Sequence, residues 1–179
     1  MIDSSITIRK ASSHDAAVVQ ALVESAYRGD TSRKGWTTEA DFFKSGRISV
    51  EDVRIKINDP DGAVLMAYDK AGDLIACCEI VKRGDSRAYF GLFAVDPHRQ
   101  GGGVGKFVLQ QGERYARQDL GCQKLEMQVI ALRDELISYY ERRGYRRTGE
   151  SRPFPYDLVG PESILRDDLS FAVLVKDLE

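Results

Sequence analysis

Ala88-Tyr-Phe-Gly-Leu-Phe-Ala-Val-Asp-Pro-His-Arg-Gln-Gly-Gly-Gly-Val-Gly-Lys-Phe-Val-Leu109 is the stretch of sequence that decides the fold. It begins as an apolar strand, breaks at Pro97, passes through a glycine-rich loop and continues as an amphipathic helix. Glycines lack the Cβ atoms that would hold a ligand away from the backbone, and the first turn of a helix has N–H groups without partners. The stretch therefore predicts an anion-binding site, which the diphosphate of a cofactor would suit.

The other segments predict that residues 1–179 form one α/β domain. Alternating or apolar runs predict strands at 6–10, 63–68, 74–81, 88–95, 124–130, 145–148 and 169–175. Helical spacing predicts helices up to residue 27 and at 49–57, 105–119 and 134–143, with a further short helix starting at Thr38. Tight turns predict an antiparallel meander of the second, third and fourth strands, and the helix after the fourth strand predicts that the fifth runs parallel to it. Gly112, in mid-helix, indicates close packing on the sheet.

The composition excludes several classes of function. With 26 Lys and Arg against 28 Asp and Glu, the net charge of −2 argues against binding of nucleic acid or of an anionic membrane. The apolar runs are far shorter than the roughly 20 residues that span a bilayer, and the first residues lack a signal-peptide pattern, so we expect a cytoplasmic protein. Three cysteines and two histidines supply neither a disulfide framework nor a metal site. We interpret Cys77, Cys78 and Cys122 as small buried apolar residues.

The spacing of the glycines separates this loop from two common phosphate-binding loops. A nucleotide-binding P-loop needs Ser or Thr after its lysine, but Phe107 follows Lys106. A dinucleotide fingerprint would need glycine at position 106 and lies near the start of a βαβ unit, whereas this loop follows a β-meander. A different diphosphate ligand is therefore expected.

Two motifs resemble the GNAT superfamily of N-acetyltransferases. Gln100-Gly-Gly-Gly-Val-Gly105 matches its Gln/Arg-x-x-Gly-x-Gly/Ala loop, and Val95-Asp-Pro97 matches the end of its fourth strand. Further along, Leu136-Ile-Ser-Tyr-Tyr-Glu-Arg-Arg-Gly-Tyr145 is similar to the family's Ala-x-x-x-Tyr-x-x-x-Gly-Phe/Tyr segment. The order of predicted elements agrees over nearly the whole chain. The resemblance implies a GNAT fold of the α/β (α+β) class, a mixed seven-stranded sheet with about four helices that is splayed between strands 4 and 5.

The resemblance also implies acetyl-CoA as cofactor and direct transfer of its acetyl group to an amine. The glycine loop would bind the pyrophosphate, and main-chain groups of Phe93 and Val95 at a bulged end of the fourth strand would hold the pantetheine and polarise the thioester carbonyl. The residues assigned by position are Phe93, Ala94, Val95, Arg99, Gln100, Gly101, Gly102, Gly103, Val104, Gly105 and Lys106. Where many members have Asn, this chain has Arg133, which would either reach a cofactor phosphate or lie in solvent at a helix start.

The resemblance places Tyr140 near the sulfur of the cofactor. A phenol with a pKa near 10 can hydrogen-bond to or protonate a thiolate whose conjugate acid has a pKa near 8.5. The alternative is a core tyrosine, and Tyr139 is the weaker candidate for the role. The fourth strand contains no acidic residue, so Glu79 on the neighbouring strand is the candidate general base. Glu79 could equally be a paired structural carboxylate, and an ordered water could carry the proton instead.

The acceptor is expected to bind between the irregular segment after the first helix and the loop before the last strand. We assign substrate contacts to Trp36, Glu39 and Phe154; their alternatives are a core or lid anchor, a solvated face and a stiffened loop, respectively. The leading hypothesis is transfer to a primary amine of a small molecule. Its rivals are a non-catalytic acyl-CoA-binding or sensing module and an enzyme that acetylates a protein lysine or N-terminus. Dimers are common in the family, so a homodimer is an open alternative to a monomer.

Overall fold

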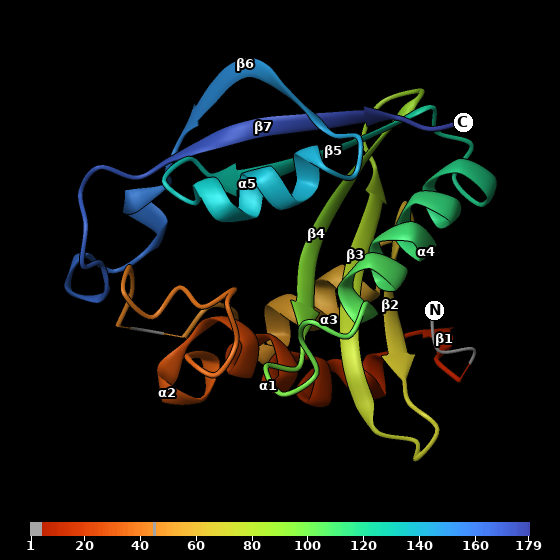
Figure 1. Ribbon diagram of the computed structural model, residues 1–179, viewed down its shortest axis with the longest axis horizontal. Coiled ribbons are helices and arrows are strands. Elements are labelled where there is room, and N and C mark those ends of the chain that lie inside the picture. The colour runs from red at the N-terminus through yellow and green to blue at the C-terminus, as the bar shows by residue number, and fades with distance from the viewer. Residues whose placement is uncertain (1–4, 45) are drawn as a thin grey trace.

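The computed structural model describes residues 5–44 and 46–179, and these fold around one mixed sheet (Figure 1). The strand order is β1-β2-β3-β4-β5-β7-β6, and only the β4–β5 pair is parallel among the described strands. The predicted seven-stranded mixed sheet and its antiparallel meander are therefore confirmed. The strands are β1 (Thr7–Lys10), β2 (Gly62–Tyr68), β3 (Leu74–Lys82), β4 (Arg87–Val95), β5 (Lys124–Ile130), β6 (Arg146–Pro153) and β7 (Ser170–Asp177).

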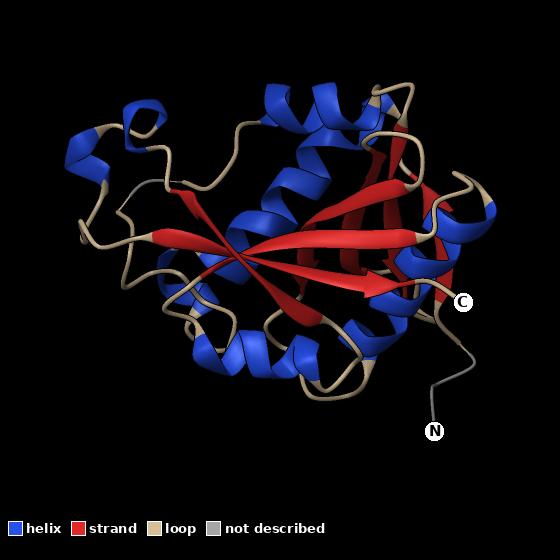
Figure 2. Ribbon diagram, turned by 90° about the horizontal axis from the view of Figure 1, so that it is seen from above, coloured by secondary structure: helices blue, strands red, loops and turns tan. Residues whose placement is uncertain are grey.

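Helices cover both faces of the sheet (Figure 2). One face packs against α1 and α3, and the other packs against α4 and α5. A Cβ atom on Gly112 of α4 would lie 2.8 Å from a ring carbon of Phe90, which confirms the predicted close packing. None of the helices within the described ranges is long and apolar enough to cross a membrane. The helices are α1 (Ala16–Tyr27), α2 (Gly29–Ser32), α3 (Val50–Ile57), α4 (Val104–Gln118) and α5 (Asp134–Glu141), with short 3-10 turns at Ser13–Asp15, Tyr156–Leu158 and Pro161–Ser163.

The predicted splay lies between β4 and β5. These strands pair only over Arg87–Tyr89 and Lys124–Glu126, and beyond this point they diverge (Figure 1). Beyond its pair with β5, β4 carries a bulge on the side that pairs with β3. Two residues separate Gly91 and Ala94 on β4, whereas one residue separates their partners Glu79 and Cys77 on β3. Leu92 in this bulge has a φ of 46°, a left-handed conformation that is costly for a residue with a side chain. The bulge confirms the irregular end of the fourth strand on which the pantetheine assignment depends.

The segment between α1 and α3 contains the main departure from the sequence prediction. No helix starts at Thr38, and the extra short helix is α2, which comes earlier in the chain. The backbone groups that would continue a helix from Thr38 pair with the segment before β7 instead: the Lys44 N–H donates to the Ser163 carbonyl (2.7 Å), and the Phe42 carbonyl accepts from the Leu165 N–H (2.9 Å). Phe43 then forms an isolated bridge with Ile164. The prediction was wrong because the backbone groups needed for a helix bind elsewhere.

The three cysteines are free and buried, as predicted. Burial raises the pKa of the Cys77 thiol to about 12, and it raises the pKa of Cys78 well above its ordinary value. These thiols therefore stay protonated and act as small packing residues.

Candidate active site

Two cavities lie where β4 and β5 diverge, and they share four lining residues. The glycine-loop cavity has a volume of about 550 Å³ and is lined by the glycine loop, α4 and α5. The arginine cavity has a volume of about 260 Å³ and is lined by Arg28, Arg47 and Arg133 together with parts of β4 and β5. The shared residues are Tyr27, Phe93, Leu136 and Tyr140. Molecules bound in the two cavities would therefore meet beside these four side chains.

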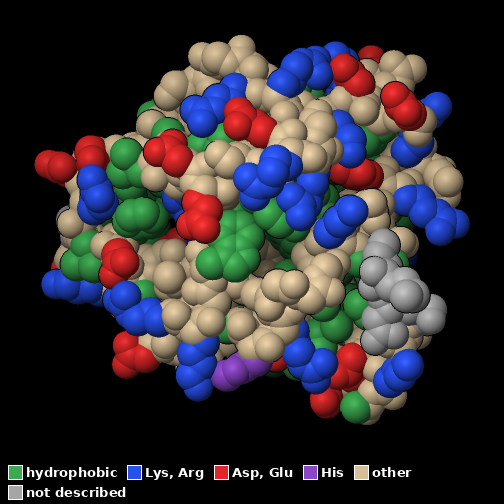
Figure 3. Space-filling view, in the orientation of Figure 1, with side chains coloured by type: hydrophobic (Ala, Val, Ile, Leu, Met, Phe, Trp, Pro, Cys, Tyr) green, Lys and Arg blue, Asp and Glu red, His purple; other side chains and the backbone are tan. Residues whose placement is uncertain are grey.

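The glycine-loop cavity has the features of an anion site. Gly101 and Gly103 have φ values of 89° and 85°, and no heavy atom lies within 4 Å of the Cβ position of either. Gly103 is the N-cap residue of α4, and it has no side chain that could accept a hydrogen bond from the N–H groups of the first turn. Around the middle of the face in Figure 3, apolar side chains lie next to a group of Lys and Arg side chains. The cations that line this cavity are Lys106, Arg142 and Arg143, and Glu135 is its acidic residue.

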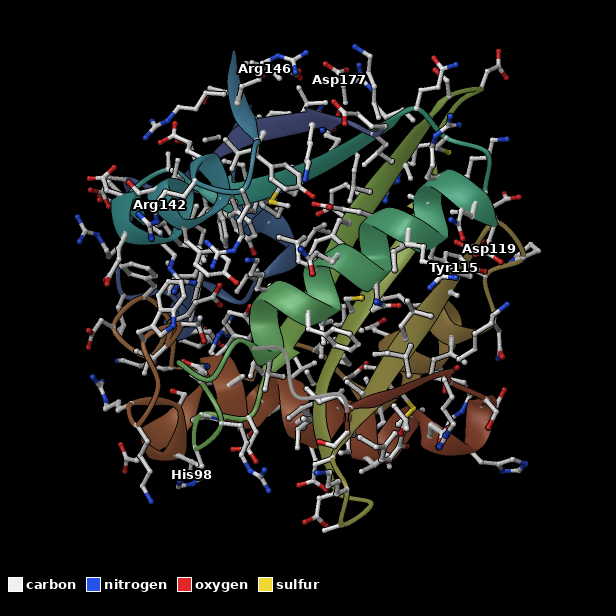
Figure 4. The ribbon with its side chains drawn as sticks, turned by 45° about the vertical axis from the view of Figure 1, so that its right-hand side comes forward. His98, Tyr115, Asp119, Arg142, Arg146 and Asp177 are labelled. Atoms are coloured by element: carbon white, nitrogen blue, oxygen red, sulfur yellow. The ribbon has the colours of Figure 1, made fainter. Side chains whose placement is uncertain are left out.

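Arg143 points to an anionic ligand most directly. Its Nε is buried and has no hydrogen-bond partner within the described ranges. Its Nη1 donates to the Tyr139 carbonyl (2.8 Å), and its guanidinium carbon lies 3.4 Å from the centroid of the Tyr139 ring. Arg142 directly follows α5 (Figure 4) and lines the same cavity. An orphaned donor beside two further cations fits a ligand that carries phosphates.

Two polar loop residues have side chains that bind the protein itself. Gln100 donates to the Thr37 hydroxyl (2.9 Å) and to the Val95 carbonyl (3.1 Å), and it accepts from the Trp36 N–H (2.9 Å). Arg99 donates to Asp69 (2.7 Å) and does not line either cavity. Gln100 therefore ties the Trp36 segment to the end of β4, and the loop would bind a ligand through its backbone.

The predicted residues of β4 divide between the cavities and the core. Phe93 lines both cavities, Val95 lines the glycine-loop cavity, and Ala94 is buried in the core against α1. The Tyr27 hydroxyl donates to the Phe93 carbonyl and so fixes the bulge. Sequence reasoning missed Tyr27 because it continues the apolar stripe of α1. Gly102 and Val104 lie in the loop and at the start of α4 without lining either cavity.

Tyr140 lies at the junction of the two cavities. Its side chain is buried, yet its hydroxyl makes no hydrogen bond with any residue that the structure describes. Burial raises the pKa of this phenol well above 10, and Tyr27 and Tyr139 act in the same direction. The phenol is therefore a neutral donor over the ordinary range of pH. Tyr139 lines the glycine-loop cavity but not the arginine cavity, and its hydroxyl lies 3.1 Å from the Cβ position of Gly105.

The predicted substrate contacts lie in different places. Trp36 lines the glycine-loop cavity, where its ring is 5.2 Å from that of Tyr139. Phe154 lines the arginine cavity and stacks on Phe43 with centroids 5.5 Å apart, which agrees with a wall of an acceptor site. Glu39 is only 6% exposed, so the alternative of a solvated face is wrong.

Glu39 lies among three guanidinium groups in the arginine cavity. Its carboxylate oxygens are 3.1 Å from Arg28, 3.5 Å from Arg47 and 3.7 Å from Arg133. The side chain of Arg133 is 9% exposed, and Arg133 lines the arginine cavity but not the glycine-loop cavity. Arg133 is therefore neither in solvent nor in the glycine-loop cavity. No motif in the sequence indicated Arg28 or Arg47.

Glu79, the candidate base, forms an ion pair. Its carboxylate is buried and accepts from Lys56 of α3 (3.0 and 3.2 Å). It does not line either cavity, although its Oε1 lies 3.3 Å from the Cβ position of Gly91, which lines the arginine cavity. This geometry favours the structural alternative. Both histidines are exposed, and Figure 4 shows His98 on the loop after β4.

Comparisons with known proteins agree on one family. A family model described as "Acetyltransferase (GNAT) family" matches residues 17–145. A mycothiol acetyltransferase of Salinispora tropica (strain ATCC BAA-916 / DSM 44818 / JCM 13857 / NBRC 105044 / CNB-440) is 30% identical over 115 residues, which are 60% of this chain and 38% of the relative. The mycothiol acetyltransferase of Salinispora arenicola (strain CNS-205) is 29% identical over 68% of this chain and 44% of its own length. The chain thus spans less than half the length of the curated relatives it matches.

Solved structures share the fold. A mutant of the spermidine N-acetyltransferase SpeG from Vibrio cholerae superposes with a TM-score of 0.72 at 15% identity, covering 98% of this chain and 95% of that one. At these identities the likeness concerns the architecture alone.

Proposed function

The chain belongs to the acetyltransferase (GNAT) family, and from this premise we propose that it transfers the acetyl group of acetyl-CoA directly to a primary amine of a small molecule. The observation that carries the proposal is the position of Tyr140, a neutral buried phenol with an unused hydroxyl between two cavities. One cavity suits a phosphate-bearing cofactor, and the other suits a small acceptor.

The residues of the glycine-loop cavity fit coenzyme A. The backbone of Gly101, Gly103 and Gly105 would meet the pyrophosphate, because Gly101 and Gly103 have positive φ values with open space at their Cβ positions, and Gly105 lies in the first turn of α4. Lys106, Arg142 and Arg143 would neutralise the phosphate charges, and the buried Nε of Arg143 would gain an acceptor. The fit therefore rests on both the shape and the charge of this cavity.

The bulge of β4 would bind and polarise the thioester. Phe93 and Val95 line the glycine-loop cavity, so their main-chain groups would meet the pantetheine, and the hydrogen bond from Tyr27 to the Phe93 carbonyl holds the bulge in place. Dipoles that are fixed before the reaction stabilise charge without reorganising during it. Tyr27 is accordingly a positioning residue.

Tyr140 would stabilise the departing sulfur. Acetyl-CoA supplies an activated acetyl thioester: the amine nitrogen bonds to the acetyl carbon, the carbon–sulfur bond breaks, and the proton lost by the amine leaves for the thiolate or for water. The raised pKa of Tyr140 makes full proton transfer from the phenol to sulfur unfavourable. Tyr140 is therefore proposed to act mainly as a hydrogen-bond donor, with the neutral amine losing its proton through water.

Thiol release from acetyl-CoA across a panel of amines tests this function. We expect Tyr140→Phe to lower kcat by a factor of roughly 10 to 100 and to leave CoA affinity within twofold, since the phenol acts on the transition state. Tyr139→Phe, on the neighbouring residue, is the matched control and should retain most of the turnover. A protein that binds CoA but releases no thiol with any amine would instead be the non-catalytic acyl-CoA-binding module. Cytoplasmic location and a dimeric state remain predictions.

A further inference from the structure

The arginine cavity has more positive than negative charge on its wall. Arg28, Arg47 and Arg133 line it against one carboxylate, Glu39. The nearby Glu24 does not line the cavity, and its Oε1 accepts from the backbone N–H groups of Arg47 (2.5 Å) and Ile48 (2.8 Å). Its charge attracts Arg28, but with Glu24 counted the three arginines still outnumber the two carboxylates. Arginine stays protonated in proteins, so the excess of charge persists at any ordinary pH.

Two of the three arginines have unused donors. Arg28 donates to Glu39 through Nε (3.2 Å) and Nη2 (3.1 Å) and to the Gly46 carbonyl through Nη1 (3.1 Å). The approaches of Arg47 and Arg133 to Glu39 are longer, and neither guanidinium makes a hydrogen bond within the described ranges. The side chain of Arg133 is nonetheless more than nine-tenths buried. The donors of this largely buried guanidinium face the cavity, where the acceptor atoms of a ligand would replace water.

Other groups facing this cavity do not offset the charge. Tyr27, Tyr89 and Tyr140 line it, and burial raises the pKa of all three phenols, so they stay neutral. Burial lowers the pKa of Arg28, and the attraction of Glu39 and Glu24 opposes this effect only in part. The electrostatic character of the cavity is therefore cationic.

Another part of the cavity wall is apolar. Phe154 stacks on Phe43 and lies beside Phe171, with centroids 5.5 Å apart in each pair. The guanidinium carbon of Arg28 lies over the Phe43 ring, 4.1 Å from its centroid. A ligand here would place an apolar group against the phenylalanines and an anionic group against the arginines.

Resting on the proposed function, we infer that the acceptor is a small amine that carries an anionic group, a carboxylate or a phosphonate-type oxyanion, held by Arg133 and Arg47. Its apolar side chain packs on Phe43 and Phe154, and its amine points toward Tyr140. The positive charges of the arginines disfavour an ammonium group in the cavity, so they favour the neutral, nucleophilic form of the acceptor amine. They also exclude polyamines, whose additional ammonium groups would be repelled.

The first test compares matched acceptors. Thiol release is measured with L-phenylalanine, its phosphonate analogue, L-phenylalaninamide and spermidine, at equal concentrations of neutral amine, because the amide lowers the pKa of its own amine. We expect kcat/KM for the better of the two anionic acceptors to exceed that for the amide at least tenfold, equivalent to about 1.4 kcal/mol. The carboxylate and phosphonate arms separate the two oxyanions. Equal use of the amide, or preference for spermidine, would overturn the inference.

The second test uses Arg133→Gln. This variant should raise KM for the anionic acceptor at least tenfold and leave KM for the amide within threefold, whereas a merely structural role would affect both equally. Arg133→Lys should restore part of the discrimination because it keeps the charge. Arg47→Gln provides a second variant on another element if Arg133→Gln does not fold, and thermal unfolding checks each protein.

A binding measurement separates failure of this inference from failure of the proposed function. N-acetyl-L-phenylalanine and N-acetyl-L-phenylalaninamide, the expected products, are titrated calorimetrically into the protein without cofactor. Binding of the acid alone, lost in Arg133→Gln, supports the anion site even if no acceptor is acetylated, and absence of turnover then counts against the proposed function. Turnover of neutral amines without binding of the acid refutes the anion site and leaves acetyl transfer intact.

Discussion

Replacing Glu39 with glutamine tests whether this carboxylate holds the arginine cavity together. The carboxylate accepts two hydrogen bonds from Arg28 and lies within 4 Å of Arg47 and Arg133. The side chains of Glu39 and Arg28 are 8% and 11% exposed, so solvent screens their attraction weakly. The substitution keeps the shape of the side chain and removes the negative charge among three cations.

The expected loss of stability follows from this burial. Removing one partner of a buried ion pair costs about 3–5 kcal/mol, because the remaining charge stays buried without compensation. Glutamine still accepts a hydrogen bond, so we expect a loss near the lower end, about 3 kcal/mol. For a domain of this size, about 3 kcal/mol corresponds to a fall in Tm of roughly 6–12 °C.

Urea unfolding of the wild type and Glu39→Gln measures the change in the free energy of unfolding. Asp41→Asn is the matched control, since the Arg33–Asp41 pair is an Arg–carboxylate contact in the same segment whose side chains are 49% and 74% exposed. This control should lose less than about 1 kcal/mol. A loss below about 1 kcal/mol for Glu39→Gln as well would refute the view that Glu39 compensates buried cations.

Three further predictions concern the loop, the core and the pH dependence of stability. Gly103→Ala and Gly72→Ala share a φ of 85° and open surroundings, so each should cost about 1–2 kcal/mol, but calorimetry should find weakened CoA binding only in Gly103→Ala. Gly112→Ala should destabilise by about 1–2 kcal/mol in urea, because overpacking against Phe90 outweighs the gain in helix propensity, and Phe90→Leu should relieve the loss. The pKa of Tyr140 is raised in the folded state, so the stability it contributes is complete below about pH 10 and falls at higher pH, where the unfolded state releases its proton first. Unfolding measured from pH 9 to 11 should therefore show a shallower decline for Tyr140→Phe; an unchanged slope would contradict a buried neutral phenol.

Local sequence signals predicted the elements that carry the cofactor side of the site. The helix predicted at 105–119 is α4 (Val104–Gln118), and the strand predicted at 124–130 is β5 (Lys124–Ile130). Glycine spacing, apolar periodicity and charged helix ends are properties of neighbouring residues, so they can be read without knowledge of the fold. The splay between β4 and β5 came from the family resemblance instead.

Local sequence patterns did not predict the residues of the arginine cavity. Arg28 follows α1, Glu39 and Arg47 lie in the irregular segment before α3, and Arg133 precedes α5. Charged residues without periodicity look like solvated surface, and only the packing of distant segments buries them together. The four-residue helix α2 is likewise too short to produce a periodic pattern. Tyr27 was hidden for the opposite reason, because an apolar stripe already explained it.

The most direct test of acetyl transfer at the junction of the two cavities uses acetyl-CoA with a ¹³C-labelled acetyl group. Mass spectrometry of the amine panel, with thiol release measured in parallel, compares the wild type with Tyr140→Phe. We predict that labelled N-acetyl product and free thiol appear in equal amounts, and that both rates fall at least tenfold in the variant while CoA still binds. Labelled acetate without acetylated amine, or an unchanged rate in Tyr140→Phe, would contradict the proposed reaction at this site.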